Sequence, residues 1–347
     1  MPKRLDTKKT YKIINDENSL KDLFSNLTRS KIFSFDTETT SIDPISAQLV
    51  GVSFSLKDSE AYYIPISHDD KGSNIVLYEK SIFDYLRILF KKKDLTVVGQ
   101  NIKYDINVLH KYEIIFDCKI QDTMLLSYIY NSSGKHDLNN LAKKYLDHDV
   151  IKYEDVVGSG VKQKVFSEID VKTAMPYACE DADITFKLYK YFIGKLKPLK
   201  DQHDLYTNVE LPLIKVIAKI EQNGVMIDAK KLDKQSIDLG QRIQLIEQDV
   251  YALADQEFNI GSPKQLQEIF YNKLKLPVIK KTPKGQPSTS EDVMQELSLT
   301  HELPKLILQY RNLSKLKNTY TDKLGVQINH QTQRLHTSYN QTVTITG

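Results

Sequence analysis

The sequence predicts an α/β domain followed by a mainly α-helical one. Runs of β-branched and aromatic residues, typical of strands, begin the first domain. Helix-length segments alternate with them from about residue 81, and strand patterns nearly vanish beyond about residue 202. A chain of 347 residues with 40% hydrophobic side chains is long and apolar enough for about two domains with their own cores.

The first strands are predicted at residues 31–35, 48–56 and 61–66, separated by segments that contain Ser, Pro or Asp. Because these three strands follow one another closely, we expect the sheet to start antiparallel. A shorter apolar strand is predicted at residues 95–98, and helical spacing is found at 122–130 and 183–192. The mixture indicates an α/β fold.

The second half reads as helices at residues 211–222, 230–254 and 264–273. Ser262 as N-cap and Pro263 at the first helical position predict the start of the third helix. Residues 280–287 form a basic loop whose two prolines and one glycine predict an exposed tip.

Three further elements are expected beyond this loop. Thr289 and Asp292 resemble a helix entry, and a longer helix is predicted at residues 304–324. Residues 326–346 alternate like a hairpin, and a strand that stops at Gly347 predicts a chain that has been cut there.

Composition narrows the function without deciding it. The 48 basic and 45 acidic residues leave a net charge of +3, which neither demands nor excludes nucleic acid. Cys118 and Cys179 are too few for a disulfide framework or a cysteine zinc site. The sequence shows no signal peptide, no bilayer-length apolar run and no repeat, so a cytoplasmic protein is expected.

Acidic residues occur at three places where they can meet. Asp36 and Glu38 directly follow the first strand, two residues apart and so on one face. Asp105 follows the strand at 95–98 and opens a helix, while Tyr177 and Asp181 lie four apart on another helix. Each place alone has an ordinary explanation: a solvated acidic pair, a first-turn acid near the helix dipole, or an amphipathic helix. Their joint occurrence in this order indicates a site.

Phosphodiester hydrolysis explains why these residue types would be assembled. Four carboxylates could bind two Mg²⁺ or Mn²⁺ ions about 4 Å apart, since both are hard cations that prefer oxygen ligands. We expect Asp36 to bridge the ions, Glu38 and Asp181 to complete the first site, and Asp105 to hold the second through water. Tyr177 would orient the attacking water.

These residues resemble the Klenow-type portion of bacterial DNA polymerase I, of polymerase family A, whose proofreading domain is a DEDDy exonuclease with an RNase H-like fold. The resemblance is carried by Phe35-Asp36-Thr37-Glu38-Thr39, Gly99-Gln100-Asn101-Ile102-Lys103-Tyr104-Asp105 and Tyr177-Ala178-Cys179-Glu180-Asp181-Ala182-Asp183. It implies a 3′-5′ exonuclease domain at residues 8–205, with Asp36, Glu38, Asp105 and Asp181 as metal ligands and these four with Tyr177 as catalytic residues.

The resemblance also implies contacts with a frayed single-stranded 3′ end. Ile42 and Tyr153 stand where the family often has Leu and Phe, and they would pack around the terminal nucleotide. Core packing explains these two side chains about equally well. Asn101 and Tyr104 would line the same groove.

Residues 206–347 resemble the polymerase thumb and the start of the palm, through Ser262-Pro263-Lys264-Gln265-Leu266, Pro287-Ser288-Thr289-Ser290-Glu291 and His336-Thr337-Ser338-Tyr339-Asn340-Gln341. The resemblance implies that duplex DNA lies along the thumb and that binding is salt-dependent and nearly blind to sequence. It further implies a monomeric, cytoplasmic and nucleoid-associated protein. The residues expected to face DNA are Lys280, Lys281, Lys284, Lys315, Lys317, Asn318, Thr319 and Tyr320.

Two features depart from the family pattern. Pro176 precedes the motif tyrosine, and because proline inside a helix costs about 3 kcal/mol, we expect the helix to kink or to begin there. The fingers and the palm carboxylates that the family uses for polymerisation do not occur in these 347 residues, so the chain is expected not to polymerise. The alternatives are a non-catalytic DNA-binding scaffold, which the retained acids disfavour, and a DEDDy exoribonuclease, which the thumb-like segments disfavour.

Overall fold

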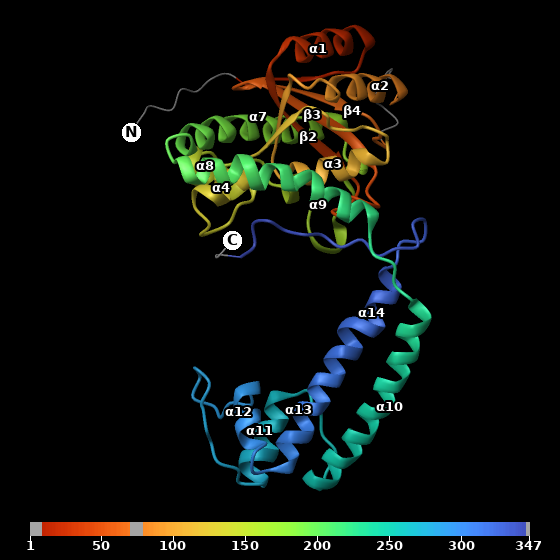
Figure 1. Ribbon diagram of the computed structural model, residues 1–347, viewed down its shortest axis with the longest axis vertical. Coiled ribbons are helices and arrows are strands. Elements are labelled where there is room, and N and C mark those ends of the chain that lie inside the picture. The colour runs from red at the N-terminus through yellow and green to blue at the C-terminus, as the bar shows by residue number, and fades with distance from the viewer. Residues whose placement is uncertain (1–8, 70–78, 345–347) are drawn as a thin grey trace. The chain divides into compact units, whose positions relative to one another are not determined.

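The computed structural model describes residues 9–69 and 79–344, which form two compact units (Figure 1). Unit 1 comprises residues up to Asn223 together with the segment from Thr337 onward, and unit 2 comprises Gly224 to His336. Among the described residues, no helix is long and apolar enough to cross a membrane.

Unit 1 contains one mixed sheet of six strands, in the order β1-β4-β3-β2-β5-β6. The central strands β2, β3 and β4 pair antiparallel, whereas β5 and β6 extend the sheet in parallel beside β2. The predicted antiparallel start is therefore confirmed. The strands are β1 (Thr10–Ile13), β2 (Ile32–Thr39), β3 (Leu49–Lys57), β4 (Glu60–Pro65), β5 (Thr96–Gly99) and β6 (Lys119–Asp122).

Helices cover both faces of this sheet, which confirms the predicted α/β class. The longest of them, α7, packs on the three antiparallel strands. The helices of unit 1 are α1 (Glu17–Arg29), α2 (Glu79–Phe90), α3 (Ile102–His110), α4 (Thr123–Tyr130), α5 (Leu138–Leu146), α6 (Tyr153–Val157), α7 (Val171–Leu196), α8 (Lys200–Leu205) and α9 (Leu211–Asn223), with a π-helical turn at Tyr206–Glu210.

Alternation along β2 decides what each face of the sheet carries. Phe33 and Phe35 are fully buried in an aromatic core, where the ring of Phe35 lies 5.1 Å from that of Phe90 in α2. Successive side chains of a strand point to opposite faces, so Asp36 lies on the other face with Ser34. The Ser34 hydroxyl donates to the Ala182 carbonyl at 2.6 Å, which places that face against α7.

Unit 2 is helical, as predicted. Its core is formed by α10 and α13 together with the shorter α11 and α12, around the fully buried Phe270 and Met294. Ser262 caps α11 through a hydrogen bond to the Gln265 amide, as expected. The helices are α10 (Ala229–Ala254), α11 (Pro263–Gln267), α12 (Glu291–Leu297), α13 (Glu302–Lys315) and α14 (Asp322–Leu324), with π-helical turns at Glu268–Lys273 and Leu316–Thr321.

Several local expectations were wrong. The predicted strand at 31–35 continues to Thr39, so the two acids lie inside β2 and not after it. Helix α7 does not begin at Pro176, which was one of the two expectations: it starts at Val171, with Asp170 as N-cap, and runs through the proline. Helix α12 begins at Glu291 with Ser290 at the cap position, one residue after the predicted Thr289.

The C-terminal hairpin is also not formed in the part of the chain that the structure describes. Residues 326–344 contain no strand there, only isolated bridges from Asn329 to Arg334 and from Leu335 to Val225. The remainder of the predicted hairpin, at 345–346, lies outside the described residues.

Candidate active site

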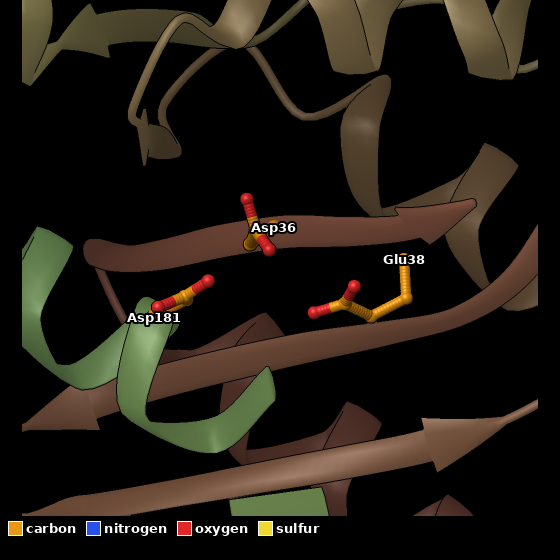
Figure 2. A group of neighbouring side chains, drawn as sticks. All are labelled: Asp36, Glu38 and Asp181. Carbon is orange, nitrogen blue, oxygen red and sulfur yellow. The ribbon is translucent and has the colours of Figure 1, made fainter. Parts of the chain in front are cut away.

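Three carboxylates converge where β2 meets α7. Asp36 and Glu38 are two residues apart on β2, and Asp181 reaches them from α7 (Figure 2). One oxygen from each of the three lies within 4.8 Å of the others. Local structure explains the convergence, because the strand places its two acids on one face and Ser34 holds α7 against that face one residue away from Asp181.

Glu38 offers a buried carboxylate oxygen to which a cation could bind. Its side chain is only 6% exposed, and its Oε1 atom accepts no hydrogen bond from the residues that the structure describes. A buried carboxylate oxygen without a partner costs free energy, whereas a bound cation would satisfy it. The donor set is oxygen only, which suits Mg²⁺ or Mn²⁺. The three residues therefore fit a hard divalent cation.

The electrostatics of the cluster also favour a cation. Burial raises the pKa of Asp36 from 3.8 to about 7. The pKa values of Glu38 and Asp181 are raised well above their ordinary range, first by burial and then by the charges of neighbouring acids. A positive ion placed among these groups would restore their charged forms.

Asp105 lies beside these three residues and is held by a different contact. It is 2% exposed on α3, and its carboxylate accepts a hydrogen bond of 2.6 Å from the Thr37 hydroxyl. Its pKa is raised well above normal by burial first and by the charge of Asp36 second. The structure thus brings the fourth predicted acid near the other three, without placing it in the same close group.

Tyr177 faces the site from one turn before Asp181. Its phenol lies on the same face of α7 as Asp181, as the four-residue spacing predicts. The pKa of Tyr177 is raised, first by burial and then by the charges of Asp181 and Glu38, so the phenol keeps its proton at neutral pH. The proline at 176 does not turn this side chain away.

Aromatic and apolar side chains border the cluster. Tyr153 is 40% exposed, stacks on Phe166 with a centroid distance of 6.3 Å, and lies 6.1 Å from the ring of Tyr177. Ile42, at 96% exposure, does not belong to the core. The Tyr104 hydroxyl donates to the Ser41 carbonyl, so it secures the loop that carries Ile42.

The remaining predicted site residues lie outside the group of three carboxylates. Asn101 is the N-cap residue of α3, in the left-handed conformation with φ of 58°, and borders a small pocket with Met124 and Tyr339. In unit 2, Lys317 is bound internally by Ser236 and Asp322 at 2.8 Å and 2.9 Å. The other side chains expected to face DNA are exposed, namely Lys280, which pairs with Asp292, and Lys281, Lys284, Lys315, Asn318, Thr319 and Tyr320.

Sequence reasoning missed three residues that shape the site. Thr37 holds Asp105, and Ser34 ties β2 to α7. Gly51 pairs with Glu38 across the sheet, and a Cβ atom there would lie 2.1 Å from the Tyr63 hydroxyl. A glycine inside a strand pattern signals such a close approach, whereas the hydroxyl contacts have no local signature.

Comparisons with known proteins identify the families that two parts of the chain match. The model of the 3′-5′ exonuclease family matches residues 11–197, and the model of DNA polymerase family A matches residues 229–347. The DNA polymerase I of Pseudomonas aeruginosa is 46% identical over 97% of this chain, and that of Borreliella burgdorferi is 39% identical over 97%. The chain spans 37% and 36% of the length of these two relatives.

A solved structure shares the fold. The POL domain of Pol1 from M. smegmatis, in complex with DNA primer-template and dNTP, superposes with a TM-score of 0.78 at 20% identity. The match covers 96% of this chain and 53% of that one.

Proposed function

Because the chain belongs to the 3′-5′ exonuclease family and aligns with bacterial DNA polymerases I over nearly all of its length, we propose that unit 1 hydrolyses the 3′-terminal phosphodiester of DNA. The products would be nucleoside 5′-monophosphates, and in a polymerase the activity would remove misincorporated nucleotides. One observation carries the proposal: oxygens of Asp36, Glu38 and Asp181 converge within 4.8 Å, and the buried Oε1 atom of Glu38 has no hydrogen-bond partner among the described residues.

We assign the acids to two cation sites. Asp36, Glu38 and Asp181 would hold the first Mg²⁺ or Mn²⁺, with Asp36 shared with a second that Asp105 completes through water. Bound divalent ions would supply a nucleophilic hydroxide at neutral pH and positive charge at the leaving oxygen.

Tyr177 and Tyr153 have separate roles in this proposal. Tyr177 stays protonated, so it can donate a hydrogen bond that orients the attacking water but cannot act as the base. The half-exposed ring of Tyr153 and the exposed side chain of Ile42 offer stacking and apolar surfaces to an unpaired 3′ nucleotide. Asn101 and Tyr104 would line the path of the same strand.

DNA is the partner that we propose for unit 2 as well. The exposed basic tip at 280–284 and the exposed residues 315 and 318–320 would contact phosphates of a duplex. Lys317 fits this role less well than its neighbours, because it already pairs with Asp322.

The direct test uses a 5′-labelled DNA primer with a mismatched 3′ end, Mg²⁺ and no nucleotides. We expect stepwise shortening from the 3′ end that EDTA and Asp36→Ala abolish and that Asp84→Ala, at an exposed position on α2, leaves unchanged. A primer that is bound but stays intact would reject the exonuclease and favour a DNA-binding scaffold. Faster shortening of the matching RNA would instead indicate an exoribonuclease.

A further inference from the structure

A buried ion pair lies behind α3, on the side away from the acidic cluster. Lys103 of α3 and Glu221 of α9 form a very short contact, and their side chains are 12% and 5% exposed. A buried pair is stable only when further hydrogen bonds satisfy the remaining lone pairs and protons. The contacts around this one meet that condition.

Glu221 accepts hydrogen bonds from three donors, two on α3 and one in the segment from Thr337 onward. Its Oε1 atom accepts from Lys103 and from the Tyr339 backbone amide at 2.7 Å, and its Oε2 atom accepts from the Asn107 side chain at 2.6 Å. Lys103 in turn donates to the Tyr339 carbonyl. The ion pair thus holds both backbone groups of one residue, in the segment from Thr337 onward that returns to unit 1.

Helix geometry connects the hydrogen bonds of Glu221 to the candidate active site. Lys103 and Asn107 are four residues apart, so they lie on the same face of α3. Asp105 is two residues from each, which at about 100° per residue places it about 200° around the helix, on the opposite face. Glu221 therefore grips α3 from behind while Asp105 projects from its front toward Thr37.

We propose that Glu221 is a positioning residue for Asp105 and that the backbone of Tyr339 helps to hold α3 in the same position. This inference rests on the proposed exonuclease function. Lys103 lies in the stretch that matches the exonuclease family, whereas Tyr339 lies in the stretch that matches the polymerase family. The rotation of the helix that carries Asp105 is consequently set in part by polymerase-family backbone.

The test compares Glu221→Ala with Glu221→Gln, which keeps the shape and one acceptor oxygen. We expect Glu221→Ala to lower kcat about 10- to 100-fold, because small misplacements of a catalytic group cost rates of this order. The KM for the primer should change less than threefold, and more Mn²⁺ should be needed for half-maximal rate. Glu221→Gln should recover at least half of the loss on a logarithmic scale.

The matched control is Glu210→Gln, whose carboxylate accepts a hydrogen bond from Gln341 of the same returning segment but belongs to the turn before α9. It should leave kcat within twofold of wild type. Equal losses for Glu210→Gln and Glu221→Ala, or a Glu221→Ala loss that appears only in KM, would overturn the proposal.

A second readout is independent of catalysis. Amide hydrogen exchange in α3 should accelerate at least tenfold in Glu221→Ala, with exchange in α7 unchanged. If the wild-type chain proves inactive, the proposed function fails, but this measurement still tests whether Glu221 holds α3. Unchanged exchange in α3 would show that Glu221 does not hold the helix.

Discussion

Replacing Asp36 by Asn should stabilise the metal-free protein while abolishing its activity. The nearest oxygens of the three converging carboxylates lie within 4.8 Å, a separation at which two full charges repel by about 3 kcal/mol at an effective dielectric constant of about 20. The rise in the pKa of Asp36 from 3.8 to about 7 corresponds to about 4 kcal/mol once the group is ionised. Relaxation of the protein around the charged groups reduces both the repulsion and the free energy that corresponds to the pKa shift. We therefore expect Asp36→Asn to raise the free energy of unfolding by about 2 kcal/mol.

The stabilisation gained from Asp36→Asn depends on pH. Because the folded-state pKa of Asp36 is raised, protonation favours the folded state, and this stabilisation is lost as the pH rises from about 4 through about 7. The advantage of Asp36→Asn over wild type should therefore be less than half developed at pH 5 and complete at pH 8. Added Mn²⁺ should raise the Tm of wild type and should raise that of the variant much less.

Thermal unfolding in EDTA at pH 5 and pH 8 measures this effect. About 2 kcal/mol corresponds to a Tm rise of roughly 4 to 8 °C for a unit of this size. Asp183→Asn is the matched control, because Asp183 is fully buried but pairs with Lys187 at 2.7 Å and accepts a hydrogen bond of 2.8 Å from Tyr11. Breaking that pair should destabilise by about 3 kcal/mol. A lower or unchanged Tm for Asp36→Asn at pH 8 would refute the reasoning.

Three further outcomes are expected. Gly51→Ala should destabilise by about 1 to 3 kcal/mol in urea unfolding, because its Cβ would meet the buried Tyr63 hydroxyl at 2.1 Å, whereas Gly194→Ala, in a helix with open space, should stabilise by up to about 1 kcal/mol; equal effects would contradict the packing argument. Asp105→Asn should slow primer shortening at least 100-fold while Mn²⁺ still raises the Tm, and loss of that Tm response would place Asp105 in the first cation site. Removing the basic tip should weaken binding to primer-template duplex and flatten its dependence on log salt by about 0.9 for each phosphate that is no longer neutralised, as fluorescence anisotropy at several salt concentrations would show; an unchanged slope would exclude the tip from the interface. The basic tip is removed by replacing Lys280, Lys281 and Lys284 with Ala in one variant.

Periodicity predicted the elements that are long or strongly patterned. The central strands and the helices from α9 to α13 were found near their expected places, because alternation and helical spacing report directly which face is buried. The edge strands β1 and β6 and the helix α1 were missed. The two edge strands have four residues each, and their pairing partners lie far away in the sequence, so local pattern carries little information about them.

The candidate site divides in the same way. Residue types and spacing were enough to select Asp36, Glu38, Asp105, Tyr177 and Asp181 and to suggest a hard cation. Only the structure shows which of these side chains can contact DNA. Ile42 is exposed to solvent and not part of the core, whereas Lys317 forms an ion pair with Asp322. A charge on a helix looks the same in sequence whether its partner is water or another side chain.

What the sequence by itself determined is which residue types come together: two acids two positions apart next to a strand, a tyrosine and an acid one helical turn apart, and a helical second half. Only the tertiary structure decided how these groups are held. The Thr37 hydroxyl on Asp105 and the Glu221 carboxylate on Lys103 join residues 68 and 118 positions apart. Periodic patterns arise from neighbours within a few residues, whereas such contacts depend on where the folded backbone returns, and no local pattern encodes that return.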